Sequence, residues 1–493
     1  MANRTFTFTS LVGISCLLLS TVVVSAESNA LFGWSKQAST SSATGTFTPD
    51  LDLVKSIGEQ TSEKQSLPKI HHWTTAKGAR VYYAHAPQLP MIDLQITFDA
   101  GSARDGDQPG LSQITNRTFD EGADELDAGD IAARFESVGA EFSTTALRDM
   151  AILRLRTLTE EKPLTVSLST LETMLLSPSF NYDSINLERK RMVVRIQASQ
   201  QSPSRLNNNA FFEAIYGNHP YSSPVLGTVE SLEQISREDL FDFYERYYTS
   251  GNAVIALVGA IDKKQAETIA EQLSQAMPAG DKAAALPHAM IKTGGETQHV
   301  EFPSSQSHIK VGHPGIKRGD PDTFAISVGN YILGGGGFVS RITTEIREKR
   351  GLSYSSYSRF LPMHAEGPFM MGLQTQAAQT EEALTVLKQT LKDFIEQGPS
   401  VEEVTAAKRN LTGGFPLNLA SNKNIVEHMS SIGFYQLPLD YLETYTQNIN
   451  SVTLNDIKDA FKRRVSLDNL VTVIVGEKVE QSPVVQAGAT STP

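Results

Sequence analysis

The sequence predicts an α+β protein made of two similar domains, each a mixed or antiparallel sheet with helices packed on one face. Strand-like apolar segments alternate with amphipathic helical segments along the chain. Some neighbouring strands are joined by short turns, as in residues 80–101, and such turns favour antiparallel pairing. The second half of the chain also repeats the first. A length of 493 residues with 40% hydrophobic and 20% charged residues is typical of a globular protein with a large core.

The first residues have the pattern of a secretory signal. Arg4 precedes an apolar run over residues 11–24, and Ser25 and Ala26 supply small residues for cleavage after position 26. We therefore expect a signal peptide at 1–26, export to a bacterial periplasm and a flexible, Ser/Thr-rich leader at 27–66. An uncleaved membrane anchor is the alternative. Cys16 is the only cysteine and lies in this run, so the mature chain would need no disulfide.

An internal repeat defines the domains. Residues 235–259 align without gaps to residues 452–476, and each segment reads as a capped amphipathic helix followed by a buried strand. A second pair, the strand-and-turn segments that begin at Asp93 and His308, occurs at nearly the same offset. Two matches in the same order indicate duplication. The sequence predicts domains at 67–280 and 296–480, a linker at 281–295 and a disordered tail at 481–493.

The segment 333–357 carries the most specific motif, LGGGGFVSRITTEIREKRGLSYSSY. It predicts a glycine-rich turn at 334–337, a helix that starts near Phe338 and ends at Gly351, and a strand over 352–360. The glycines lack a following Lys, which disfavours a phosphate loop. A tight turn that allows close backbone approach to a peptide fits better.

This segment resembles the C-terminal-domain signature of the pitrilysin–insulysin–mitochondrial processing peptidase family of zinc peptidases. The resemblance implies paired α/β sandwich domains that face each other across a cleft. It also implies that Arg347 and Tyr354 face the peptide substrate. A fixed guanidinium and a phenol are suited to binding a peptide carbonyl and the oxyanion that develops from it.

The same resemblance implies a zinc motif, H-x-x-E-H, on a helix of the N-terminal domain. Residues 99–124 have its frame, and alignment on Gly110 puts Gln113 and Arg117 at the two His positions and Asn116 at the catalytic base. Gln197 falls where a third ligand, a Glu, is expected. Neutral amides are poor zinc ligands and a guanidinium repels the metal, so we expect no zinc and no other cofactor in this chain.

Other metal sites are disfavoured by the sequence. His71 and His72 are adjacent, and in an extended segment they would point to opposite faces. Residues 424–428 end in Glu-His but lack the first His of the motif, and by the repeat they correspond to the helical segment 209–217. An acidic cluster most simply serves solvation, with a weak cation site as the lesser alternative; its members are Asp120, Glu121, Asp124, Glu125 and Asp127.

Three functions remain open. A formal charge of -12 argues against nucleic acid or an anionic membrane surface as a partner, which leaves membrane contact only through the N-terminal segment. The resemblance favours a non-catalytic subunit that pairs with a zinc-bearing paralogue containing H-x-x-E-H, binds unfolded peptide along a sheet edge and donates Arg347 and Tyr354. The alternatives are a peptide-binding or structural scaffold without activity, and an active peptidase with another metal site.

Overall fold

The computed structural model describes residues 69–478. The expected signal peptide, leader and tail lie outside these residues. Within them, no helix is both long and apolar enough to cross a membrane.

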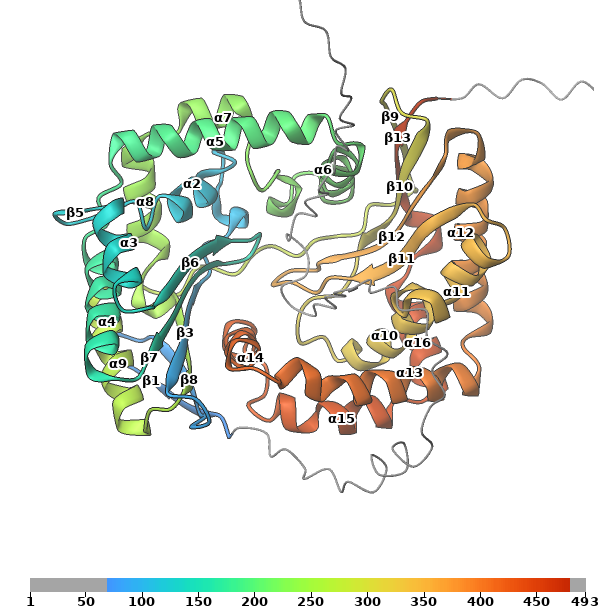
Figure 1. Cartoon of the computed structure of the whole chain (residues 1–493). Coiled ribbons are helices and arrows are strands. Elements are labelled where there is room, and N and C mark those ends of the chain that lie inside the picture. The colour runs from blue at the N-terminus through green and yellow to red at the C-terminus, as the bar shows by residue number, and fades with distance from the viewer. Residues whose placement is uncertain (1–68, 479–493) are drawn as a thin grey trace, which may run out of the picture. The chain divides into compact units, whose positions relative to one another are not determined.

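Two sheets with helices form the described part of the chain (Figure 1). The first half contains strands β1 (His71–Thr74), β2 (Arg80–His85), β3 (Met91–Phe98), β4 (Gly122–Ala123), β5 (Leu126–Asp127), β6 (Glu141–Ala146), β7 (Ala151–Leu158) and β8 (Ala253–Gly259). Its α-helices are α2 (Leu111–Arg117), α3 (Ala128–Glu136), α4 (Glu161–Leu176), α5 (Tyr182–Gln200), α6 (Pro203–Tyr216), α7 (Val229–Gln234), α8 (Arg237–Tyr247) and α9 (Lys263–Ala276). Short 3₁₀ turns are η1 (Ser102–Arg104), η2 (Pro220–Ser222) and η3 (Ser250–Asn252).

The second half begins after residues 277–296, which contain no helix or strand and include the expected linker. Its strands are β9 (Thr297–Glu301), β10 (Gln306–Pro314), β11 (Ser353–Phe360), β12 (Pro368–Gln376) and β13 (Val471–Gly476). Its α-helices are α10 (Thr323–Asn330), α11 (Arg341–Thr343), α12 (Thr380–Gln397), α13 (Val401–Gly414), α14 (Asn422–Tyr435), α15 (Tyr441–Ser451) and α16 (Leu454–Arg464). Short 3₁₀ and π-helical segments are η4 (Tyr331–Gly335), η5 (Gly337–Val339), η6 (Thr344–Glu348), η7 (Ala377–Gln379), η8 (Phe415–Leu419) and η9 (Leu467–Asn469).

The five strands of the second sheet repeat the order of five strands in the first, as duplication requires, and the first sheet has one additional edge strand, β1. The first has the order β1-β2-β8-β3-β7-β6, and the second has the order β9-β13-β10-β12-β11. In each sheet one parallel pair, β2 with β8 or β9 with β13, is followed by antiparallel pairs. The repeated segments of the sequence form α8 with β8 and α16 with β13. The predicted α+β fold with mixed sheets is confirmed. The short turn within residues 80–101 does not make an antiparallel pair, because β8 lies between β2 and β3.

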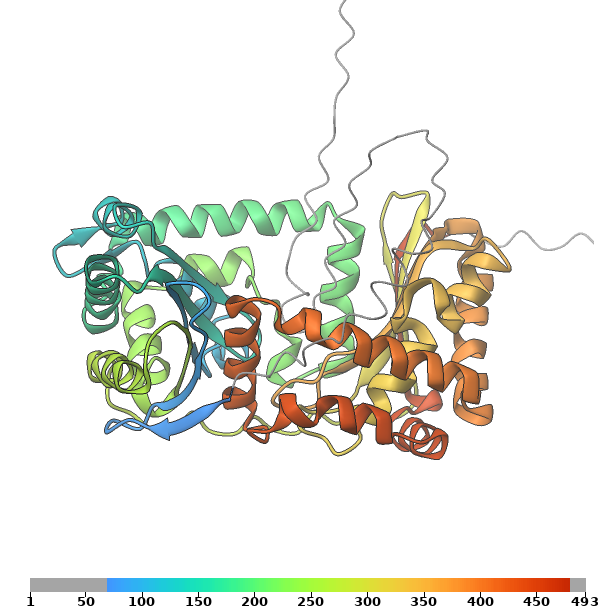
Figure 2. The same cartoon turned by 60° about the horizontal axis from the view of Figure 1, so that its bottom comes forward.

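The opposite face of each sheet is covered by a helix from the other half of the chain. Helix α6, from the first half, packs on β10 and β13, and α14, from the second half, packs on β3 and β8 (Figures 1 and 2). The Asn207 amide on α6 donates hydrogen bonds of 3.0 and 2.9 Å to the carbonyls of His308 and Val473. Helices α6 and α14 occupy corresponding positions in the internal repeat. Each half therefore covers the other half's sheet with the equivalent helix, and this exchange of helices links the two halves.

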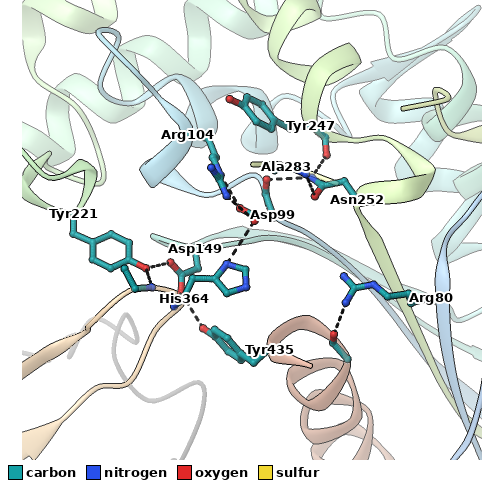
Figure 3. A network of polar contacts seen from close by, with 12 residues as sticks. Arg80, Asp99, Arg104, Asp149, Tyr221, Tyr247, Asn252, Ala283, His364 and Tyr435 are labelled. Atoms are coloured by element: carbon teal, nitrogen blue, oxygen red, sulfur yellow. Dashed lines mark hydrogen bonds and ion pairs between the residues drawn. The ribbon is translucent and has the colours of Figure 1, made fainter. Parts of the chain in front are cut away.

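A buried polar network joins the halves at the same seam (Figure 3). Asp149, beside β7, accepts hydrogen bonds of 2.5 Å from the Tyr221 hydroxyl and 3.1 Å from the Tyr435 hydroxyl. It also accepts one of 2.8 Å from the backbone N–H of His364. Tyr221 belongs to the first half, whereas Tyr435 and His364 belong to the second. Donors from both halves therefore satisfy the hydrogen-bonding capacity of one buried carboxylate.

The glycine-rich segment differs in detail from its prediction. The helix begins at Arg341, after the 3₁₀ turn η5, and ends in the π-helical turn η6. A Cβ on Gly334 would lie 2.3 Å from the backbone nitrogen of Ser358. The close approach expected at this glycine is therefore made by the chain's own strand β11, which leaves no room for a side chain.

Candidate functional site

Helix α2 stands where the sequence places the degenerate zinc site. Gly110 precedes its first residue as the N-cap, and the φ of 97° at Gly110 is a left-handed conformation that glycine adopts without strain. Asp105 accepts hydrogen bonds of 2.8 Å from the backbone N–H groups of Gly110 and Ser112, and so caps the helix. Burial raises the pKa of Asp105 to about 7 despite these bonds.

The two amides on α2 are buried and already bonded. Gln113 donates a hydrogen bond of 2.7 Å from its Nε2 to the carbonyl of Ala146, the last residue of β6. Asn116 donates one of 3.3 Å from its Nδ2 to the hydroxyl of Tyr248. Arg117, at the second His position, is half-buried. These side chains offer no anionic or imidazole donor, and one carries a positive charge, so they do not fit a zinc ion.

The expected third position is not gathered with these residues. Gln197 lies on the exposed side of α5, whose buried face carries Ile185, Glu188, Met192 and Ile196. The buried carboxylate of this helix is Glu188, which forms an ion pair with Arg191. Glu188 was not among the residues singled out from the sequence, which placed only Gln197 at the third position. Helical spacing offered a signal, since Glu188 precedes Met192 by four residues on the same face.

The remaining metal candidates form no centre in the described part of the chain. Between residues 69 and 478, no three His, Cys, Asp or Glu residues are placed to hold one ion. His71 and His72 stack on Tyr83 and Tyr82, as adjacent residues on opposite strand faces should. Asp127, from the acidic cluster, caps α3. In the near-miss motif, burial lowers the pKa of His428 to about 4.

Arg347 and Tyr354 are brought together at the corner between η6 and β11. The Arg347 guanidinium carbon lies 4.3 Å from the centre of the Tyr354 ring and 4.6 Å from the centre of the Phe338 ring. One guanidinium nitrogen donates a hydrogen bond of 3.4 Å to the Tyr354 carbonyl. Two aromatic rings thus hold the cation in one orientation. The contact between Phe338 and Arg347 was not predicted from the sequence. The feature that could have indicated it is the position of Phe338 directly after the glycines at 334–337.

The neighbouring cations behave differently from Arg347. Lys349 and Arg350 both pair with Glu345, at 2.6 and 2.7 Å. These contacts lower the pKa of Glu345, with Lys349 as the main cause. Arg347 instead contacts Glu348 at 3.6 Å and keeps most of its donors for other groups. It is therefore not merely one of three equivalent surface cations.

Tyr354 stands at the open edge of the second sheet. Its side chain is 81% exposed, and β11 is the terminal strand in the sheet order. The register between β11 and β12 shifts between Ser353 and Ser356, so the bulge turns Tyr354 and Ser355 outward. A pocket of about 260 Å³ beside Tyr354 is lined by residues that include Gln306, Gln374 and Gln376.

This arrangement can bind a peptide but cannot activate water. The N–H groups of Arg347 and the hydroxyl of Tyr354 are hydrogen-bond donors suited to a carbonyl oxygen. An edge strand such as β11 can accept an extended peptide as an additional strand, although the carbonyls of Tyr354 and Ser358 already accept hydrogen bonds from Arg347 and Asn330. Neither side chain is a carboxylate or an imidazole, and α2 supplies no metal ligand set.

Family models match most of the described chain. Residues 80–229 match the model described as insulinase (peptidase family M16), and residues 234–411 match the one described as the peptidase M16 inactive domain. A Helicobacter pylori protein named "Non-peptidase homolog YmxG" is 25% identical over 401 residues, which cover 81% of this chain and 92% of that protein. A Bacillus subtilis relative, "Uncharacterized zinc protease YmxG", is 24% identical over 384 residues, or 78% and 92% of the two chains.

Solved structures agree with these matches. A crystal structure of a peptidase M16 inactive domain from Pseudomonas fluorescens superposes with a TM-score of 0.81 at 38% identity and covers 84% of this chain and 99% of that one. A protease from Helicobacter pylori shares the fold, with a TM-score of 0.75 at 18% identity over 83% of this chain and 100% of that one.

Proposed function

The chain belongs to peptidase family M16, and from this premise we propose that it is the non-catalytic subunit of an exported zinc metallopeptidase. It binds unfolded peptide and pairs with a zinc-bearing paralogue that contains H-x-x-E-H. It donates Arg347 and Tyr354 to the substrate in the partner's site. The signal-like N-terminus supports a periplasmic location.

The proposal rests on a contrast between the degenerate zinc site on α2 and the Arg347–Tyr354 pair. The α2 amides of Gln113 and Asn116 are buried and bonded within the chain, whereas the Arg347–Tyr354 pair is built, oriented and open to solvent. The Arg347 guanidinium lies within 4.6 Å of the centres of two aromatic rings, those of Tyr354 and Phe338. This combination favours a chain that contributes to substrate binding while another chain supplies the metal.

The role of the pair follows from its chemistry. Arg347 and Tyr354 would donate hydrogen bonds to the carbonyl of the bond being cut, and more strongly to the oxyanion that replaces it. The peptide would lie along β11 as an added strand, so its backbone would align with the pair. This chain's residues bind and orient; the partner's metal supplies the activated water.

The test is to mix the purified chain with its zinc-bearing paralogue and measure peptide hydrolysis. We expect activity to require both chains, and Arg347→Ala to lower kcat about 10²- to 10³-fold, as for the loss of an oxyanion donor. Arg350→Ala is the matched control, because Arg350 is bound to Glu345 and does not contact Tyr354. Full activity of the paralogue alone, together with no effect of Arg347→Ala in the mixture, would refute the proposal.

A scaffold without an enzymatic partner is the second candidate. The name of the Helicobacter pylori relative, "Non-peptidase homolog", favours it. The two functions differ in what accompanies the chain: absence of an H-x-x-E-H paralogue from the neighbouring genes would favour the scaffold. In that case Arg347→Ala would still weaken peptide binding, measured directly with the purified chain.

A further inference from the structure

A carboxylate-free, cationic face occupies the second sheet beside the Arg347–Tyr354 pair. Strands β10, β11 and β12 contain no Asp or Glu, yet they carry His308, Lys310 and Arg359. The register places Lys310 opposite Gly372, which is opposite Tyr357. His308 and Arg359 lie two residues away along their strands, so all these side chains share one face. All are half-buried, so solvent reaches them.

Lys310 is the centre of this face. Its ammonium donates a hydrogen bond of 2.6 Å to the amide oxygen of Asn208 on α6, a neutral partner. Burial lowers the pKa of Lys310 to about 7, and the positive charge of Arg359 lowers it further. No ion pair between described residues includes Lys310 or Arg359. A desolvated cation beside a second cation is unfavourable unless an anion joins them.

The first sheet provides an internal comparison, because it descends from the same repeat. There the cations of β7 are compensated: Arg156 pairs with Asp93 of β3 at 2.9 Å, and Arg154 pairs with Glu427 of α14 at 3.5 Å. On the second sheet, α6 presents Asn208 instead of a carboxylate. The lack of compensation is therefore specific to one sheet and not a property of the fold.

The glycine opposite Lys310 brings a phenol close to the ammonium. Gly372 has no side chain, and the phenol of Tyr357 lies over it, where a Cβ would be 2.6 Å from the hydroxyl oxygen. Phe211 and Val473 contribute to the apolar cluster on this face. On the side of His308, the face continues through Gln374 to the pocket beside Tyr354. A ligand at Tyr354 and one at Lys310 would share a continuous surface.

We propose that Lys310, Arg359 and Tyr357 form a subsite for a carboxylate of the bound peptide, either an acidic side chain or the C-terminal carboxylate. The guanidinium and the ammonium supply charge, and the phenol supplies a neutral donor. Tyr357 follows Tyr354 by three residues on β11, about 10 Å along a strand, so one extended peptide spans both places. The assignment of the carboxylate to a peptide rests on the proposed function. The affinity of the three side chains for a carboxylate does not depend on that function.

The subsite makes binding dependent on pH. Protonated Lys310 binds an anion, so affinity rises as pH falls through about 7 and declines above it. The other groups that face Lys310 do not reverse this trend: burial raises the pKa of Tyr357 on β11, Arg359 on β11 contributes a guanidinium, and Asn208 on α6, Gly372 on β12 and Val473 on β13 do not titrate. The pKa of His308 is lowered by burial, so His308 adds charge only at lower pH.

The test is calorimetric titration of the whole purified chain with acetylated peptides of one neutral sequence. The first is amidated, the second has a free C-terminus, and the third is amidated with one internal Glu. At about pH 6 we expect at least one carboxylate peptide to bind about tenfold more tightly than the neutral one. The better binder identifies the source of the carboxylate. Above the Lys310 pKa, binding should take up a proton, measured from the dependence of the heat on buffer.

Lys310→Met should abolish both the preference and the proton uptake, while Lys264→Met, at an exposed position on α9, should keep them. Glutarate, titrated alone, separates this inference from the proposed function. Glutarate that binds the wild type but not Lys310→Met upholds the subsite even if no peptide binds. Equal affinity for all three peptides, or a preference retained by Lys310→Met, overturns the subsite and leaves the role of Arg347 untouched.

Discussion

The hydroxyl of Tyr435 donates a hydrogen bond of 3.1 Å to Asp149, which is 286 residues earlier in the chain. This contact links α14 of the second half to the end of β7 in the first. Burial and the negative charge of Asp149 raise the pKa of Tyr435 far above its ordinary value, so the phenol remains a donor at any physiological pH.

Asp149→Asn should destabilise the fold by about 3 kcal/mol, because an amide cannot accept from Tyr221, Tyr435 and the His364 backbone at once and leaves a buried donor unsatisfied. Urea unfolding measures the change. Asp262→Asn is the control: it replaces the exposed N-cap of α9 with an equally good cap and should cost less than about 0.5 kcal/mol. Similar costs for the two variants would show that the seam contributes little.

Gly433→Ala should loosen the packing of α14 on the first sheet. A Cβ there would lie 2.4 Å from the Tyr82 ring and 2.7 Å from Val254, so the helix must shift, at a cost of about 1–3 kcal/mol. Gly413→Ala on α13 is the matched control, since its Cβ would meet nothing within 4 Å. It should stabilise the helix by up to about 1 kcal/mol. Thermal unfolding should show a lower Tm for Gly433→Ala and an unchanged or higher Tm for Gly413→Ala.

Lys310→Met should flatten the pH dependence of stability. Folding lowers the pKa of Lys310 from 10.5 to about 7, so the unfolded chain binds more protons between these values and wild-type stability rises with pH across that range. The variant lacks this rise, so its advantage over wild type should be full at and below about pH 7 and shrink as the pH rises toward 10.5, on the order of 1.4 kcal/mol for each pKa unit of the shift. Urea titrations at several pH values, with Lys264→Met as reference, measure it; parallel profiles would contradict a desolvated Lys310.

Phe338→Ala should lower peptide hydrolysis by the mixed subunits several-fold without unfolding the chain. The ring of Phe338 is 58% exposed and lies against the Arg347 guanidinium, so its loss frees Arg347 to reorient while little core is removed. Val339→Ala, at a neighbouring residue that is 73% exposed, is the control. Equal rates for the two variants would mean that Phe338 does not position Arg347.

The motifs were readable from the sequence because they are local. The helix and strand that carry Arg347 and Tyr354 lie within one short segment, so the pattern of residues 333–357 predicted both elements, and the family resemblance singled out the two side chains. The duplicated topology was readable too, because the apolar patterns of residues 235–259 and 452–476 coincide. The frame of α2 was recognisable from the Pro-Gly entry and the helix that follows, even though the residues at the ligand positions differ.

Features that depend on contacts between distant segments of the chain could be seen only in the tertiary structure. The exchange of α6 and α14, the shared bonds of Asp149 and the uncompensated charge of Lys310 depend on hydrogen bonds between residues 72 or more positions apart. Local periodicity shows that a helix has an apolar face but not which sheet covers it. Likewise, burial and the absence of a counter-ion are set by all neighbours at once, so no spacing along the sequence could reveal that Lys310 is desolvated.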